Sequence, residues 1–139
     1  MTTPGNERVG GCLCGGVRYR LTLPLVDAGY CHCRLCQRAT GAPVVMWATV
    51  PVAEFRYERG SVGVFASSPQ YQREFCPQCG TQMVFRAIRD PQTVDVTVGS
   101  LDQPESVQPL YHIWIESQVP WLQMGDALPR YADHGPDGA

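Results

Sequence analysis

Seven cysteines, gathered into three short clusters, constrain this 139-residue chain more than any other feature of its sequence. The clusters contain two, three and two cysteines: Cys12 and Cys14; Cys31, Cys33 and Cys36; and Cys76 and Cys79. A closed structural zinc site takes four protein ligands, whereas a catalytic zinc takes three and keeps a position for substrate or water. One site of each kind would use all seven cysteines.

The segment Cys76-Pro77-Gln78-Cys79-Gly80 is the strongest single motif. Two cysteines three apart around a tight turn direct both sulfurs at one cation. Cys12 and Cys14 supply a second pair, because residues i and i+2 of an extended chain face the same side. We therefore expect these four to bind one structural ion that joins the starts of two strands. The alternative, two disulfides or inert buried thiols, is disfavoured by the spacing and by a reducing compartment.

The central trio is Cys31, Cys33 and Cys36. At this spacing, an extended pair that runs into a helical turn can surround one ion. The fourth ligand position would then be open to substrate. His32 points away from its two neighbours if the chain is extended, so we expect it to pack or hydrogen-bond rather than to ligate. Three alternatives stay open: a zinc site closed by His32 or the distant His112, a redox pair, and an iron–sulfur cluster that borrows a ligand.

Short stretches of alternating apolar and polar residues predict a mainly β fold with little helix. The clearest runs from Val17 to Leu23. Fourteen glycines and twelve prolines interrupt the chain too often for long helices. One short helix is expected over 34–39, ending near Thr40-Gly41. The further strands are expected at 44–50, 54–58, 62–67, 82–88, 94–98 and 112–116.

Charge and hydropathy narrow the class of partner. The formal net charge is −2 and the basic residues are scattered, so no nucleic-acid partner is expected. No apolar run approaches the roughly 20 residues that cross a bilayer, so no membrane partner is expected either. The first residues do not resemble a secretory signal, which makes the cytoplasm the expected location. All eleven basic residues are arginine, which excludes a lysine Schiff base. A small molecule is the expected partner, and the sequence does not indicate an oligomeric state.

Three motifs resemble the glutathione-dependent formaldehyde-activating (GFA) enzyme family, which includes the centromere protein V type. They are Gly11 to Tyr19, Cys31 to Pro43 and Phe75 to Thr81, with a looser match from Pro109 to Trp114 and at Pro120-Trp121 and Leu128-Pro129. The resemblance implies an Mss4-like zinc-binding β-sheet fold. We expect a single domain over 1–139, with an ordered core at about 8–130 and a frayed tail at 131–139.

The resemblance also implies the ligand sets and the activity. Cys12, Cys14, Cys76 and Cys79 would bind the structural zinc, and Cys31, Cys33 and Cys36 the catalytic zinc. The activity implied is a carbon–sulfur lyase or synthase reaction, in which glutathione, as co-substrate, and formaldehyde form S-hydroxymethylglutathione. The alternative is a protein that binds glutathione or another thiol without turnover, or a structural zinc protein.

The chemistry of three thiolates agrees with this activity. They outweigh the charge of Zn²⁺, so the site should activate water poorly and should favour a soft fourth ligand such as a substrate thiol. The second zinc is expected to be the more labile of the two. Arg34 and Arg38 are candidates to bind the glutathione carboxylates, although both could be solvated surface residues. Further candidate contacts or wall residues are Gln37, Thr40, Trp47, His112 and Trp114.

Overall fold

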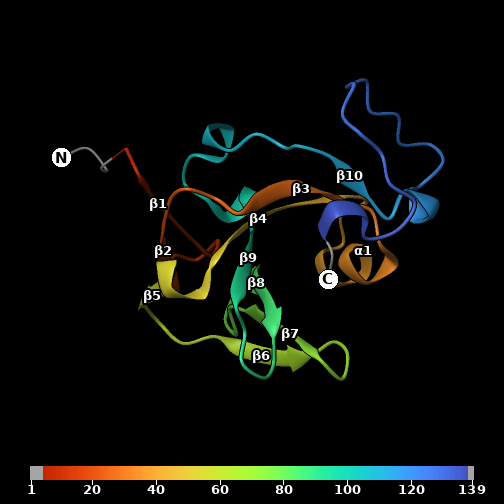
Figure 1. Cartoon of the computed structure of the whole chain (residues 1–139). Coiled ribbons are helices and arrows are strands. Elements are labelled where there is room, and N and C mark those ends of the chain that lie inside the picture. Colours follow the sequence, from red (N-terminus) through yellow and green to blue (C-terminus); the bar gives the residue numbers. More distant parts are fainter. Residues whose placement is uncertain (1–4, 138–139) are drawn as a thin grey trace.

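The computed structural model describes residues 5–137, which form ten strands in two sheets and one α-helix (Figure 1). The smaller sheet is antiparallel and has the order β1-β2-β5. Its strands are β1 (Glu7–Gly11), β2 (Arg18–Thr22) and β5 (Phe55–Arg59). The prediction of a mainly β fold is confirmed.

The larger sheet has the order β10-β3-β4-β9-β8-β7-β6, and its β10–β3 pair is parallel while the other pairs are antiparallel. Its strands are β3 (Asp27–Cys31), β4 (Val45–Pro51), β6 (Gly63–Ala66), β7 (Tyr71–Phe75), β8 (Gln82–Ala87), β9 (Thr93–Thr97) and β10 (His112–Ile113). The 3₁₀ turns are Val52–Glu54, Val98–Ser100, Pro104–Ser106, Ile115–Ser117 and Gly135–Asp137.

Alternation of side chains explains the strands that were predicted. In β2, Tyr19 and Leu21 are buried while Arg18, Arg20 and Thr22 lie nearer the surface. Each predicted strand up to 94–98 lies within two residues of an observed one at either end. The turn at Gly60 joins two strands, of which β5 belongs to the small sheet and β6 to the large one. This turn is therefore a crossing between sheets and not a hairpin.

Three strands were not predicted, and each has a local reason. β1 ends in two glycines, and β3 contains Gly29, so neither has a strong β-forming sequence. In β7 the two buried residues are Arg73 and Glu74, which reverses the usual pattern of apolar burial. These strands are stabilised by tertiary contacts that a pattern of apolar residues does not report.

The strand predicted over 112–116 is wrong beyond its second residue. β10 ends at Ile113, and Trp114 adopts a left-handed backbone with φ 58° and ψ 40°. A 3₁₀ turn over Ile115–Ser117 follows. The left-handed residue ends the strand, because its backbone groups no longer point along the ladder.

The helix α1 (Arg34–Thr40) matches its prediction closely. Cys33 is its N-cap, and the sulfur accepts a hydrogen bond from the amide of Cys36 at 3.3 Å. Gly41 ends the helix in the left-handed region with φ 74°, and its amide donates to the carbonyl of Gln37. The short helix therefore places two of the central cysteines on one turn.

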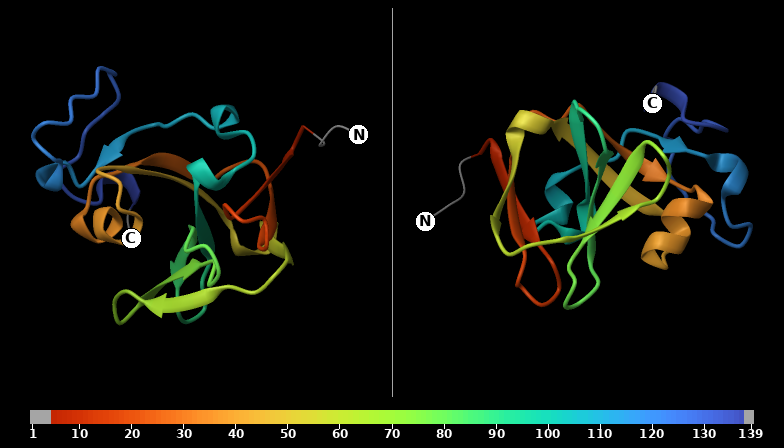
Figure 2. Two further views of the ribbon diagram at one scale, coloured as in Figure 1. Left: turned by 180° about the vertical axis from the view of Figure 1, so that it is seen from behind. Right: turned by 90° about the horizontal axis from the view of Figure 1, so that it is seen from below.

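The buried residues form two separate clusters. The larger one fills the space between the sheets and includes Tyr19, Leu21 and Met83. The smaller one contains Cys31, Cys36, Val45, Trp47, Tyr111 and Ile113. It lies at the end of the molecule where α1 meets the C-terminal segment, opposite the hairpin of β1 and β2 (Figures 1 and 2).

The C-terminal segment returns to the strand region through backbone hydrogen bonds. The amide of His112 donates to the carbonyl of Pro129, and the amide of Tyr131 donates to the carbonyl of His112, both at 2.9 Å. The carbonyl of Tyr131 accepts a bond from Ile115, and that of Asp133 accepts one from Trp114. Residues 138–139 of the expected tail lie outside the described residues. The extent of fraying and the single-domain assignment stay predictions. In residues 5–137 the longest helix spans seven residues, which is far too short to cross a membrane.

Candidate metal centres and substrate cavity

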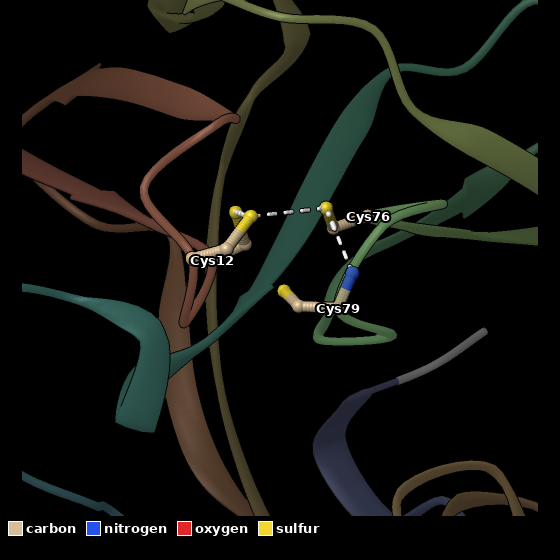
Figure 3. Close-up of side chains that lie close together, drawn as sticks. Cys12, Cys76 and Cys79 are labelled. Atoms are coloured by element: carbon tan, nitrogen blue, oxygen red, sulfur yellow. Dashed lines mark hydrogen bonds between the residues drawn. The ribbon is translucent and has the colours of Figure 1, made fainter.

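Four cysteines meet between the loops of two hairpins, one from each sheet. Cys12 and Cys14 lie in the loop that joins β1 and β2, and Cys76 and Cys79 in the loop that joins β7 and β8 (Figure 3). The four sulfurs lie within 4.8 Å of one another, with 3.5 Å between Cys12 and Cys14 and 3.8 Å between Cys14 and Cys76. Sulfurs bound to one tetrahedral zinc at about 2.3 Å lie about 3.8 Å apart, so this group fits a metal ion.

Backbone amides surround the sulfurs of this quartet. The amide of Val17 donates to Cys12 Sγ at 3.2 Å, and the amides of Gln78 and Cys79 donate to Cys76 Sγ at 3.4 Å. The hydroxyl of Thr81, followed by its backbone amide, lowers the pKa of Cys79 to about 5. These donors stabilise thiolates, which are the form that binds a metal. A bound ion would join the two sheets at this point.

The central trio forms a second group at the end of β3 and the start of α1. The sulfurs of Cys31, Cys33 and Cys36 lie within 4.8 Å of one another, and within residues 5–137 no histidine or carboxylate joins them. Cys31 and Cys36 are buried and Cys33 is half-buried. The trio thus offers three soft ligands to one ion, where the quartet offers four.

Arg73 is the functional side chain that sequence reasoning missed. It projects from β7, is 6% exposed, and places its two terminal nitrogens 3.7 and 3.8 Å from Cys36 Sγ. Its guanidinium also lies over the ring of Phe85, 5.0 Å from the centroid. The carboxylates of residues 5–137 form no ion pair with it. In the sequence, the one indication of this role is that an arginine comes shortly before the Cys76 motif. The strand that carries it, β7, was not predicted, so its burial was not expected.

The three thiols of the trio titrate as one unit. Hydrogen bonds with Cys31 and then Cys36 lower the pKa of Cys33 to about 2, and the charge of Arg73 acts in the same direction. Hydrogen bonds with Cys33 and Cys36, together with burial, raise the pKa of Cys31. Negative charge therefore collects on this group of sulfurs beside a buried guanidinium.

A cavity of about 430 Å³ opens onto the trio, and all three of its cysteines line it. Its volume is that of a small-molecule site. The apolar part of the wall comes from Trp47, Tyr71, Phe85, Tyr111, Ile113 and Trp114. Gly29 of β3 also lines it, and a Cβ there would lie 2.5 Å from the ring of Tyr111. Glycine is therefore needed at this position for Tyr111 to lie across the strand.

Of the four residues expected to contact glutathione, only Arg34 lines the cavity beside the trio. The Nη1 of Arg34 donates to Gln37 Oε1 at 2.6 Å. Gln37 is buried and donates to the carbonyls of His32 and Ser117, so it is engaged in holding the chain. Arg38, one turn further along α1, is exposed and lies outside the cavity lining. Thr40 donates to the carbonyl of Cys36 and lines a different hollow.

The two histidines near the trio bond to each other. His32 is fully buried, and its Nε2 lies 2.8 Å from His112 Nδ1. The Nε2 of His112 in turn lies 3.0 Å from a carboxylate oxygen of Asp126. Neither histidine belongs to the metal-binding group or lines the cavity. The pair ties the CHCRLC segment, residues 31–36, to β10 and to the loop that follows it. The other two wall candidates, Trp47 and Trp114, do line the cavity.

Comparisons with known proteins agree with this architecture. An uncharacterised lyase of the fission yeast Schizosaccharomyces pombe is 29% identical over 79 residues. The match covers 57% of this chain and 57% of the yeast protein, so the chain aligns with little more than half of that relative. A crystal structure of a Rhodobacter sphaeroides protein superposes with a TM-score of 0.56 at 27% identity. That superposition covers 73% of this chain and 91% of the other.

The family comparison covers most of the chain. The sequence model described as "glutathione-dependent formaldehyde-activating enzyme" matches residues 7–117. These residues include all seven cysteines, both metal-binding groups and most of the cavity wall. The chain belongs to the glutathione-dependent formaldehyde-activating enzyme family.

Proposed function

We propose that this protein is a zinc-dependent carbon–sulfur lyase that forms and cleaves S-hydroxymethylglutathione or a related adduct of a thiol and an aldehyde. The observation that carries the proposal is the position of the trio, whose three thiols line a cavity of small-molecule size. The quartet offers four ligands between two loops, as a structural site does. Family membership and the yeast relative described as a lyase support the reaction class.

The donor set favours sulfur chemistry over hydrolysis. Three thiolates outweigh the two positive charges of zinc, which makes such a centre a poor activator of water. A zinc ion at Cys31, Cys33 and Cys36 would bind the substrate sulfur as its thiolate, in reach of an aldehyde carbon. None of the seven cysteines is paired in a disulfide, so all seven sulfurs are available as metal ligands.

The chain's own residues would support the reaction in three ways. Arg73 balances the negative charge that gathers around Cys36 when another sulfur enters. The aromatic wall excludes water, which strengthens the attraction between that guanidinium and sulfur. Arg34, exposed at the cavity rim, can bind a glutathione carboxylate. The sulfur adds to the carbonyl carbon, the carbon–oxygen π bond opens, and the oxygen takes a proton.

The decisive experiment measures the exchange of glutathione with formaldehyde by NMR, with the zinc-loaded protein and with its Cys33→Ser variant. Serine is a preferred N-cap, so the variant retains the start of α1 while it loses a metal ligand. We expect the wild type to accelerate exchange and the variant to give the uncatalysed rate. Equal rates with and without the wild-type protein would rule out the lyase.

A parallel titration separates turnover from binding. Cobalt placed in the trio reports a sulfur that enters its coordination sphere through a change in absorption. If glutathione changes the spectrum while the exchange rate stays uncatalysed, the protein binds thiols without turning them over. If glutathione leaves the spectrum unchanged while exchange is accelerated, the sulfur does not enter at the metal.

A further inference from the structure

The wall above the trio is built for an apolar group larger than formaldehyde. Trp47 and Tyr111 belong to the same buried cluster as Cys31 and Cys36, and Phe85, Trp114 and Cys33 pack against that cluster. The rings of Trp47 and Phe85 have centroids 6.0 Å apart, and Tyr71 stacks on Phe85 at 4.9 Å. An aromatic surface therefore begins directly beside the metal-binding sulfurs of the trio.

The charges that line the cavity do not suit a wholly polar ligand. Arg73 faces Cys36 and covers Phe85, so its guanidinium is already engaged by the sulfurs and the ring at that end of the cavity. Arg34 remains at the rim, whereas the carboxylates of Asp95 and Glu116 also line the cavity. Glutathione carries two carboxylates and one ammonium group, and the two acidic side chains would oppose its net negative charge. The lining favours a small charged part at the rim and an apolar part in the interior.

Trp114 provides an independent observation. It has a left-handed backbone, with φ 58°, which is rare for a bulky side chain and costs free energy. It is half-buried and lines the cavity. Its backbone is held by bonds to the carbonyls of Asp133 and, from the next residue, Tyr131. Strained residues of this kind concentrate at ligand sites, where the surrounding structure maintains them.

We infer that the adduct this enzyme handles carries an aromatic group next to the carbon–sulfur bond, and that Trp114 and Phe85 help to select it. The inference rests on the proposed function. The thiolate R–S⁻ adds to the aldehyde R′–CHO, one proton is taken up, and R–S–CH(OH)–R′ forms; cleavage is the reverse. The aromatic group can enter as R′ from an aldehyde or as R from a thiol, and both place a ring against the same wall.

The test compares three substrate pairs by exchange NMR with the zinc-loaded protein. The pairs are glutathione with formaldehyde, glutathione with para-trifluoromethylbenzaldehyde, and phenylmethanethiol with formaldehyde. We expect at least one aromatic pair to show kcat/KM about tenfold or more above the first pair, after correction for uncatalysed exchange. The pair that does so identifies whether the aldehyde or the thiol supplies the ring. Preference for the first pair overturns the inference but leaves the lyase intact, whereas no acceleration in any pair contradicts the lyase and this inference together.

Two variants with a matched control test the wall. In Trp114→Gly the backbone strain disappears along with the indole, and we expect the aromatic-to-formaldehyde ratio of kcat/KM to fall about tenfold. Phe85→Leu should lower the same ratio, and it tests the wall independently if Trp114→Gly does not fold. Asp90→Gly is the control, because Asp90 also has a positive φ, 49°, but lies outside the cavity lining. A ratio unchanged in a folded wall variant overturns the role assigned to that residue.

A binding measurement gives a readout that needs no turnover. The unreactive probe is para-trifluoromethylbenzyl alcohol, observed by fluorine NMR. We expect saturable line broadening with the wild type and with Asp90→Gly, and about tenfold weaker binding with Trp114→Gly. Equal binding by all three proteins, or no saturable binding by the wild type, contradicts an aromatic site.

Discussion

Arg73 contacts Cys36 and so connects β7, the strand beside the β6 edge of the large sheet, to the helix α1. The guanidinium nitrogens lie 3.7 and 3.8 Å from the sulfur, and the same guanidinium covers Phe85. A cation buried in this way needs a negative partner, because burial of an unpaired charge is costly. The trio supplies that partner, so the metal-binding sulfurs and the cation stabilise each other.

Removal of this cation should weaken thiol binding. Arg73→Met keeps an unbranched apolar stem and loses the charge, so we expect thiol affinity to fall about tenfold to a hundredfold. Arg73→Lys keeps the charge but loses the flat surface on Phe85, and its effect should be intermediate. The measurement is the absorption change of the cobalt-loaded trio on titration with mercaptoethanol. Wild-type affinity in a folded Arg73→Met protein would contradict the assigned role.

The two arginines of α1 should differ in their effect on glutathione. Arg34 lines the cavity, whereas Arg38 is exposed outside its lining. We expect Arg34→Ala to raise KM for glutathione roughly three- to tenfold, because one charge-assisted hydrogen bond to a carboxylate is lost. Arg38→Ala is the matched control and should leave KM within about twofold. The same rise in both variants would show that the effect is one of overall charge.

The two metal groups should differ in their contribution to folding. Cys76 is buried where the hairpin loops of both sheets meet, so Cys76→Ala should lower the free energy of unfolding by about 5 kcal/mol or more. Cys36→Ala should cost about 1–3 kcal/mol and remove activity. Thermal unfolding followed by circular dichroism, combined with zinc content, measures both effects. Similar melting temperatures for the two variants would contradict the division into a structural and a catalytic ion.

The bond between His112 and Asp126 predicts a pH dependence. This hydrogen bond is the main reason that the pKa of Asp126 lies below its usual range. A carboxylate with a lowered pKa stabilises the fold above the pKa of the unfolded chain, about 3.9, and the contribution is lost as the pH falls through the lower folded value.

Asp126→Asn should therefore be less stable than the wild type at pH 7, and the difference should shrink below about pH 4. Urea unfolding of both proteins across this range gives the difference. Since both have the same seven cysteines, the pH dependence of metal binding cancels. Glu105→Gln, at an exposed position, is the control and should show a much smaller difference. A wild-type advantage that does not change with pH would rule out titration of Asp126 as its cause.

The sequence was sufficient to predict the parts of the fold that local chemistry determines. Alternation located β2, β4 and β9, and the left-handed glycine after Thr40 located the end of α1. The grouping of the seven cysteines into four and three followed from their spacing, because ligands that are close together in the sequence usually bind the same ion. The structure brings the same two sets of sulfurs together.

What could not be predicted depends on contacts between distant segments. In the sequence alone, Gly29 argues against a strand. Its reason is the ring of Tyr111, far along the chain, which lies across it in the fold. In the sequence alone, Arg73 resembles an ordinary surface arginine. Its burial depends on the pairing of β7 with β8, which places Phe85 beneath the guanidinium. Arg34 and Arg38 cannot be told apart by spacing alone, because only the position of the cavity separates them. These relationships require the register of the sheet.

The trio lies within one short segment, residues 31–36, whereas much of the cavity wall comes from β7, β8 and the residues around Trp114. Changes to the wall need not disturb the ligands of either ion. A lineage could therefore evolve new substrates by altering a few wall residues while it inherits the same metal chemistry, and members of one family need not share one substrate. Differences in substrate between relatives would therefore lie in these wall positions rather than in the cysteines.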